Sequence, residues 1–307
     1  MGIVSYAQNF EDVMLWRALG TEGPGFWIDV GASDPTLHSV THAFSERGWH
    51  GINVEPLAAE FAALQRYRPN DINLCLALAA QPGELTFYDC EDGGLSSLDP
   101  ISAERNRAAG RKVEARKVEV STLAEICARY APADIHFLKI DVEGAERQVL
   151  EGADFATYRP WIVVVEATIP MSQTDSSAEW EPLVTGAGYR FRYFDGLNRF
   201  YLAEERWSAL GRHFATPPNV FDGFILANAP GHATEARLRR AEAELALLRA
   251  ASPLIVPPMA MPRLALRAAR WLRHFFSAEL RAEIALLRHD VRTLMQQMDQ
   301  LRRELRQ

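Results

Sequence analysis

A turn with an acidic residue and a glycine follows the first buried strand expected in this chain. The segment FWIDVGASDP carries Asp29 near the end of an apolar run, with Gly31 and Ala32 shortly after it. At the carboxyl end of a first strand, a glycine lets a ligand approach the backbone, and the N-terminus of the next helix faces that ligand. We therefore expect Asp29, Gly31 and Ala32 to contact a bound cofactor.

The residues after this glycine favour a cationic ligand over a dinucleotide. A GxGxxG loop would bind a pyrophosphate, but Ser33, Asp34 and Pro35 follow Gly31 here. A pyrophosphate would also meet the carboxylates of Asp29 and Asp34. The sulfonium and amino groups of S-adenosylmethionine are cationic and match these charges better. NAD is the alternative cofactor, in an NAD-dependent sugar-modifying enzyme.

A second acidic residue ends the next expected strand, GINVEP. Glu55 follows Asp29 by 26 residues. An acidic residue at the tip of the second strand can accept hydrogen bonds from both hydroxyls of a ribose. We predict that Glu55 binds the ribose of the cofactor.

Charged residues also mark two later apolar strands, in HFLKIDVEGAE and WIVVVEAT. Alternation puts Lys139, Asp141 and Glu143 on one side of the first, and Glu166 lies near the end of the second. Ionised groups on a central strand are costly unless they converge on a ligand, a metal or a partner. In a parallel sheet the strand ends share one edge, so we expect Asp29, Glu55, Asp141 and Glu166 to gather there. An ion pair of Lys139 with Asp141 or Glu166 that only satisfies itself is the alternative.

These groups could activate a hydroxyl for nucleophilic attack. Asp141 or Glu166 could take its proton, and Lys139 could stabilise the oxyanion that develops. Alternatively, Asp141 and Glu166 could hold Mg²⁺. His38 is a further candidate for the base and for contact with the substrate, although a lone histidine is more often an ordinary surface residue.

The elements that position these residues follow an α/β pattern. Short apolar runs alternate with helical patterns, which indicates a doubly wound sheet of parallel strands covered on both faces. Later strands without helices between them indicate antiparallel pairing at the sheet edge. The expected strands are 26–32, 51–56, 72–79, 135–141 and 162–168, the edge strands 189–195, 199–204 and 221–227, a hairpin of 84–89 and 112–120, and helices at about 9–19, 36–47, 57–67, 100–109, 121–130, 144–151 and 178–186.

The bulk composition is that of a globular protein in a reducing compartment. Of the 307 residues, 48% are apolar and 24% are charged, and the three cysteines fit no zinc spacing. The N-terminal residues lack a signal-peptide pattern, and no apolar run reaches the length of a membrane span. We expect a cytoplasmic location.

Net charge and residue composition differ between two parts of the chain. Residues 231–307 carry 14 Arg against 8 Asp and Glu, whereas residues 1–230 carry 19 basic and 32 acidic residues. An acidic globule repels phosphate backbones, so we expect no nucleic-acid partner. We predict a catalytic domain over 1–230, a helical and Pro-rich linker over 231–277, and a coiled coil over 278–307.

The last segment carries a heptad pattern typical of a parallel dimer, with β-branched residues and Met at the first core position and Leu at the second. It therefore predicts a homodimer through 278–307, with a helix packed on its own globule as the alternative. The core residues are Ile284, Val291, Met298 and Leu305, and Leu280, Leu287, Leu294 and Leu301.

A basic helix with aromatic residues is expected just before the heptads, at 263–276. Such a helix can lie on an anionic membrane surface, which would place the protein peripherally at the inner membrane face. A linker helix docked on the catalytic domain is the alternative.

The segments SYAQNFEDVML, FWIDVGAS, GWHGINVEP, FLKIDVEGAERQVLEGADF, RPWIVVVEAT, YFDGLNRFYLAEE and PPNVFDGF together resemble the FkbM family of S-adenosylmethionine-dependent methyltransferases. The resemblance covers roughly residues 3–227. It implies a class I methyltransferase fold and O-methylation of a sugar, polyketide or similar small-molecule hydroxyl. The last two segments look like members found with bacterial surface-polysaccharide assembly genes, which makes a glycan hydroxyl the leading acceptor.

Further roles follow from this resemblance. The opening segment, with Tyr6, Gln8, Glu11 and Asp12, resembles a family segment expected to close over the cofactor, and Gln8 is expected to bind it. Asn198 and Arg199, beside aromatic residues, suit contact with a sugar, or serve only as turn residues. A cofactor-binding scaffold assembled through its coiled coil is the non-enzymatic alternative.

Overall fold

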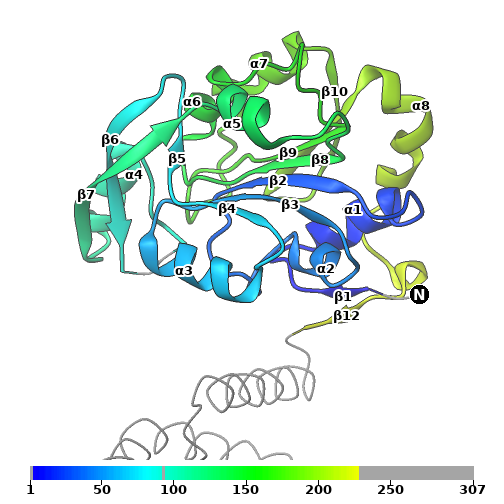
Figure 1. The fold of residues 1–307 in the computed structure, drawn as a ribbon, viewed down its shortest axis with the longest axis horizontal. Helices are drawn as coiled ribbons and strands as arrows, with labels where there is room; N and C mark the ends of the chain where they lie inside the picture. The colour runs from blue at the N-terminus through cyan, green and yellow to red at the C-terminus, as the bar shows by residue number, and fades with distance from the viewer. Residues whose placement is uncertain (1–2, 92–93, 228–307) are drawn as a thin grey trace, which may run out of the picture. The chain divides into compact units, whose positions relative to one another are not determined.

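A computed structural model of the chain describes residues 3–91 and 94–227 (Figure 1). The chain divides into two units, Met1–Ile225 and Leu226–Gln307. The predicted linker, basic helix and coiled coil lie outside the described residues. Within the described residues, no helix is long and apolar enough to cross a membrane.

A seven-stranded mixed sheet forms the centre of the domain, in the order β10-β11-β9-β8-β2-β3-β4. The neighbours from β9 to β4 pair in parallel, whereas β11 is antiparallel to both β9 and β10. This confirms the predicted parallel sheet with antiparallel strands at its edge. The strands are β2 (Phe26–Val30), β3 (His50–Val54), β4 (Ile72–Leu74), β8 (Phe137–Ile140), β9 (Ile162–Glu166), β10 (Tyr189–Phe194) and β11 (Asn198–Ala203).

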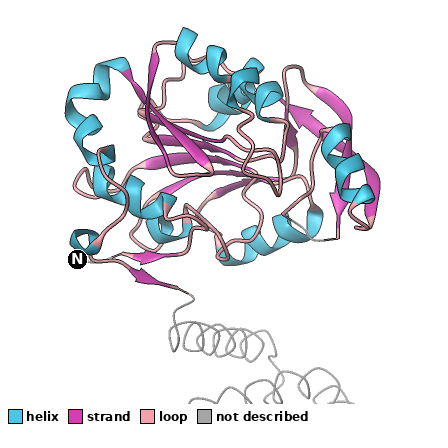
Figure 2. Cartoon of the chain, turned by 180° about the vertical axis from the view of Figure 1, so that it is seen from behind, coloured by secondary structure: helices cyan, strands magenta, loops and turns pink. Residues whose placement is uncertain are grey.

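Helices cover both faces of this sheet (Figure 1 and Figure 2). Ile28 and Leu138 pack into a core with α5, α6 and α7, whereas their neighbours Trp27 and Phe137 pack into a second core with α1 and α2. Side chains of a strand alternate between faces, so each central strand must be apolar on both. The helices are α1 (Glu11–Leu19), α2 (His42–Ser45), α3 (Ala58–Tyr67), α5 (Leu123–Tyr130), α6 (Glu146–Glu151), α7 (Glu181–Gly186) and α8 (Trp207–Leu210).

A three-stranded sheet stands beside the carboxyl ends of the central strands. It contains β5 (Ala77–Leu78), β7 (Val113–Ser121) and β6 (Gly83–Cys90), and α4 (Pro100–Ala108) lies between β6 and β7 in the sequence. The antiparallel pairing of β6 with β7 confirms the predicted hairpin. The single strand expected at 72–79 is instead two strands, because β4 pairs with β3 and β5 pairs with β7.

Two further expectations needed correction. The helix expected at 36–47 shrinks to α2, because Ser33 and His38 have positive φ angles and the Asp34 carboxylate accepts the amides of Thr36 and Leu37, forming a turn instead. The strand expected at 221–227 is reduced to β12 (Ile225–Leu226), which follows a 3₁₀ turn (Val220–Asp222) and, contrary to the prediction, does not belong to the central sheet. The remaining elements are β1 (Val4–Ser5) and the 3₁₀ turns Ser177–Glu179, Glu204–Arg206 and Gly211–Phe214.

Candidate active site

A cavity of about 350 Å³ opens where β2, β3 and β8 end. Its wall is formed by the segments that follow these three strands, with contributions from the N-terminal segment and the small sheet. The order of the central sheet reverses between β2 and β8, since the chain runs from β2 toward β4 and then from β8 toward β9. Ligands of open α/β sheets bind at such a reversal, beyond the carboxyl ends of the strands.

Gly31 fixes the wall of this cavity through its backbone. It has φ 82°, and a Cβ placed on it would lie 1.8 Å from the carbonyl oxygen of Asp141. The amide of Asp141 in turn donates to the carbonyl of Val30, at 3.0 Å, and the amides of Gly31 and Ala32 donate to Val54, each at 3.1 Å. Gly31 lines the cavity, so the predicted close approach of a ligand stays a prediction, and the backbone of Asp141 also approaches this glycine closely.

Glu55 lies in the wall as predicted. Its Oε2 accepts the amide of Ser33 at 3.0 Å, and its Oε1 accepts the amide of Leu57 at 2.8 Å. Burial raises the pKa of Glu55 to about 7, although these two hydrogen bonds act in the opposite direction. Each carboxylate oxygen keeps a further lone pair for a ligand, so bidentate binding of two hydroxyls is sterically and chemically compatible with this position.

Lys139 lines the cavity and bridges two carboxylates. Its Nζ lies 3.2 Å from Asp141 Oδ2 and 3.5 Å from Asp29 Oδ1, and it donates to the carbonyl of Gly31 at 3.4 Å. Burial lowers the pKa of Lys139, but the two carboxylates outweigh burial and raise it above its ordinary value. Lys139 is therefore a cation at neutral pH and cannot serve as a base.

Asp29 stands behind this lysine. The residues that line the cavity among those described include Lys139 and Asp141 but not Asp29. Asp29 also accepts the hydroxyl of Thr41 at 3.2 Å, and burial raises its pKa while Lys139 lowers it. The ion pair considered from the sequence, Lys139 with Asp141, is present, and both partners nevertheless face the cavity.

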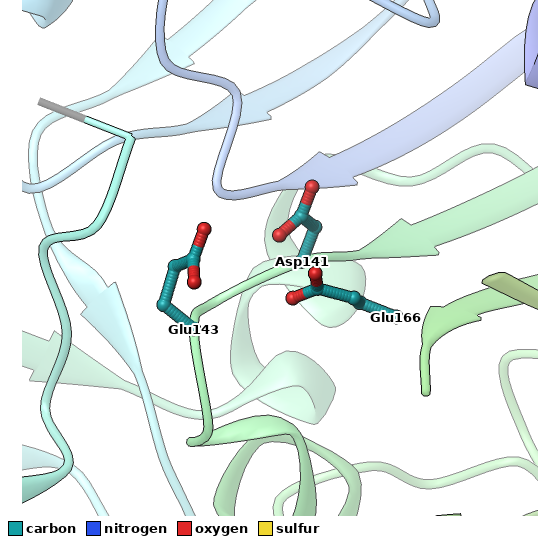
Figure 3. A group of neighbouring side chains, drawn as sticks. All are labelled: Asp141, Glu143 and Glu166. Carbon is teal, nitrogen blue, oxygen red and sulfur yellow. The ribbon is translucent and has the colours of Figure 1, made fainter. Parts of the chain in front are cut away.

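Three carboxylates converge where β8 and β9 end (Figure 3). One oxygen from each of Asp141, Glu143 and Glu166 lies within 4.8 Å of the others. Burial raises the pKa of Glu143 and of Glu166, and the charge of Asp141 raises both further. Glu143, which has φ 57°, was not selected as a site residue from the sequence, although its alternation with Lys139 and Asp141 already put it on their side.

Glu146 holds the loop that presents Asp141 and Glu143. This buried first residue of α6 accepts the amides of Val142 and Gly144 at 3.2 and 3.0 Å through a single oxygen, Oε1. Burial raises the pKa of Glu146 to about 7. Its role was missed from the sequence, where the acidic residue in the first helical turn was the available signal.

The N-terminal segment forms another part of the wall, as its resemblance to a closing segment implied. Gln8 and His38 both line the cavity, and a parallel backbone bridge joins Ala7 to His38. Asp12 holds the segment by accepting the hydroxyl of Ser5 at 2.7 Å and the amides of Tyr6 and Ala7 at 2.7 and 3.2 Å. Asp12 is thus a structural anchor.

Asn198 and Arg199 are not brought to the cavity. Asn198 is buried and donates to Glu11 at 2.7 Å. Glu11 is among the residues that line the cavity, whereas Asn198 is not. Arg199 donates to Asp175 at 2.7 Å and to Glu181 at 3.2 Å. Successive residues of β11 face opposite sides of the sheet, which separates the two side chains. The geometry therefore does not support direct contact of either with a sugar in this cavity.

Acidic side chains dominate the charge of the cavity. Such a wall attracts positively charged ligands and repels phosphates. Among the described lining residues, the acids are Glu11, Asp34, Glu55, Glu60, Asp141 and Glu143, and the basic residues are Lys139 and His38.

A cavity at the reversal point of a doubly wound sheet is the usual ligand-binding position of α/β proteins. The family model described as the methyltransferase FkbM domain matches residues 29–191, more than half of the chain. The chain therefore belongs to the FkbM methyltransferase family, as the sequence segments indicated. The match begins at Asp29, near the end of β2, and includes β3, β8 and β9 and thus the whole carboxylate group. Among curated proteins, no match to the chain was found.

Proposed function

We propose that this protein transfers a methyl group from S-adenosylmethionine to a hydroxyl of a sugar or glycan, with surface polysaccharide as the leading acceptor. The observation that carries the proposal is the acidic cavity at the strand ends, most of whose lining residues lie within the region that matches the methyltransferase family. S-adenosylmethionine supplies an electrophilic methyl group on a cationic sulfonium. The acidic wall suits that charge better than it suits the pyrophosphate of NAD.

The donor is best accommodated between β2 and β3. Glu55 would accept the ribose hydroxyls, because it lines the cavity and each of its oxygens has a free lone pair beside the backbone amide it accepts. Ala32 and Gln8 line the same space and would contact the remainder of the donor. Asp29 would act on the donor only through Lys139, since it does not reach the cavity.

The acceptor hydroxyl needs a group that takes its proton during transfer. Asp141 fits that role because it lines the cavity and its side chain is 31% exposed. Lys139, a cation 3.2 Å from Asp141, would stabilise negative charge on the acceptor oxygen. Glu166 is not among the residues that line the cavity, so it would act on the acceptor through Asp141. His38 does line the cavity and is a second candidate for the base.

Titration calorimetry with S-adenosylhomocysteine, the demethylated product, tests the donor half of the proposal. We expect binding to the wild type, and a loss of about ten- to one-hundredfold in Glu55→Gln, which removes a charged acceptor of two hydrogen bonds. Glu84→Gln, an exposed carboxylate on β6, is the matched control and should bind normally. Absence of binding to the wild type would contradict the proposal.

The acceptor half needs a product assay. Purified protein and S-adenosylmethionine are incubated with neutral oligosaccharides, and mass spectrometry is used to detect products heavier by one methylene unit. Surface glycans of cells with and without the gene provide the corresponding comparison in vivo. Methylation of amines or carboxylates, with none of hydroxyls, would refute O-methylation while leaving the methyltransferase activity itself intact.

A further inference from the structure

Asp141, Glu143 and Glu166 form a group that lacks sufficient positive charge. Their nearest carboxylate oxygens lie within 4.8 Å of one another, although they come from two different strand ends (Figure 3). In the described part of the chain, Lys139 is the cation in contact with this group, and it is shared with Asp29. One ammonium group thus faces four carboxyl groups, and repulsion between their ionised forms costs free energy unless protons or another positive charge are supplied.

Two oxygens of the group also lack hydrogen-bond partners. Oε2 of Glu143 and Oε2 of Glu166 are buried and accept no hydrogen bond from the described residues. Glu166 is only 7% exposed, and its carboxylate points toward the other two (Figure 3). A buried carboxylate oxygen without a partner is costly, so such oxygens are normally satisfied by a donor or a metal.

We propose that Asp141, Glu143 and Glu166 bind a divalent cation through one carboxylate oxygen each. Oxygen ligands on opposite sides of Mg²⁺ are about 4 Å apart, and those on opposite sides of Ca²⁺ are about 5 Å apart. Oxygens already within 4.8 Å therefore reach one ion with small side-chain adjustments. Carboxylate-only ligand sets select hard ions such as Mg²⁺, Mn²⁺ and Ca²⁺.

If the protein methylates a hydroxyl as proposed above, the position of this site in the cavity lets the bound cation activate that hydroxyl. Asp141 and Glu143 line the cavity, whereas Glu166 closes the group from behind. The open coordination positions would face the space where the acceptor lies. A divalent cation lowers the pKa of a hydroxyl in contact with it, which would ease removal of the acceptor proton.

Binding of Mn²⁺ to the whole protein, followed by electron paramagnetic resonance without any methyl donor, tests the site directly. We expect one bound Mn²⁺, displaced by Mg²⁺ or Ca²⁺. Glu143→Gln and Glu166→Gln should each weaken the affinity by at least about tenfold, because even the outer partners of a metal contribute that much. Glu60→Gln removes another carboxylate of the same cavity and should leave the affinity unchanged.

Equal affinity in the wild type and in the Glu143→Gln/Glu166→Gln double variant would overturn the site. Thermal melts give an independent readout, because an ion that binds only the folded state raises the melting temperature of the wild type and not of the double variant. If S-adenosylhomocysteine displaces Mn²⁺ competitively, the amino group of the donor occupies the position and the metal site is refuted. Product binding measured in EDTA tests the methyltransferase proposal separately, so each can fail without the other.

Discussion

The carbonyl oxygen of Asp141 lies where the side chain of residue 31 would begin. A Cβ on Gly31 would approach it to 1.8 Å, and the backbone there has φ 82°. The loops after β2 and β8 are therefore in direct backbone contact at the reversal point of the sheet. This contact sets the position of Asp141 relative to the cavity wall.

Gly31→Ala should consequently destabilise the domain strongly. A positive φ costs an alanine about 1–2 kcal/mol, and the clash with backbone adds to this, for a total of about 4 kcal/mol or more. Gly48→Ala is the matched control, since Gly48 has φ 81° but no heavy atom within 4 Å of its added Cβ. For Gly48→Ala, urea unfolding should show a loss of only about 1–2 kcal/mol in the free energy of unfolding. Similar losses in both variants would contradict the proposed contact.

Lys139→Met should be among the most destabilising substitutions of a charged residue. It leaves Asp29 and Asp141 without their shared partner, and breaking a buried pair by removing one side costs about 3–5 kcal/mol. Adding Asp29→Asn to Lys139→Met should recover part of this loss, as measured by urea unfolding. Lys112→Met, in an exposed ion pair, should leave stability unchanged. A double variant less stable than the single one would contradict the pairing.

The apolar strands were predictable from the sequence because they are buried on both faces. Runs such as IVVVE leave no polar position for solvent, so β9 was recognised without knowledge of its neighbours. The convergence of parallel strand ends placed Glu55 and Asp141 at one edge of the sheet, and both line the cavity.

The partners of individual charged side chains could not be predicted from the sequence, because they depend on the register between distant strands. Asp29 pairs with Lys139 across β2 and β8, which turns an expected cofactor ligand into the partner of a lysine. Likewise, Asn198 is the neighbour of Glu166 across β11 and β9. The side-chain amide of Asn198 donates a hydrogen bond to Glu11 and so does not reach the cavity. Local alternation predicts which side of a strand a residue faces, but not which charge of another strand lies beside it.

Glu146 should make stability depend on pH. Burial raises its pKa from 4.5 to about 7, so the native state binds the proton more tightly than the unfolded chain does. Stability contributed by this group is full below about 4.5 and is lost as pH rises through about 7, by up to about 3 kcal/mol. Glu146→Gln keeps an oxygen for the amides of Val142 and Gly144 and should flatten this fall. Urea unfolding in EDTA between pH 5 and 8 measures it; an unchanged slope in the variant would argue against the assignment.

The heptad pattern of residues 278–307 predicts a dimer, and this prediction concerns residues outside those described. Deleting 278–307 should convert the protein from a dimer to a monomer, because the stripe of core positions is the basis for association. Light scattering coupled to gel filtration gives the mass in solution. Persistence of the dimer after deletion would show that association has another source.

Asp141→Asn should separate binding from chemistry. The substitution removes the charge that accepts a proton while preserving the size of the side chain, so kcat/KM for methyl transfer should fall by about 10²–10⁴. Product affinity should change little, because Glu55 rather than Asp141 is proposed to hold the ribose.

Comparison with Glu55→Gln completes the test: that variant should weaken S-adenosylhomocysteine binding and raise KM for the donor, with a smaller effect on kcat at saturation. If Asp141→Asn kept full turnover, the proton would have to pass to another residue, and His38→Asn would be the next variant to examine, since His38 shares the cavity wall.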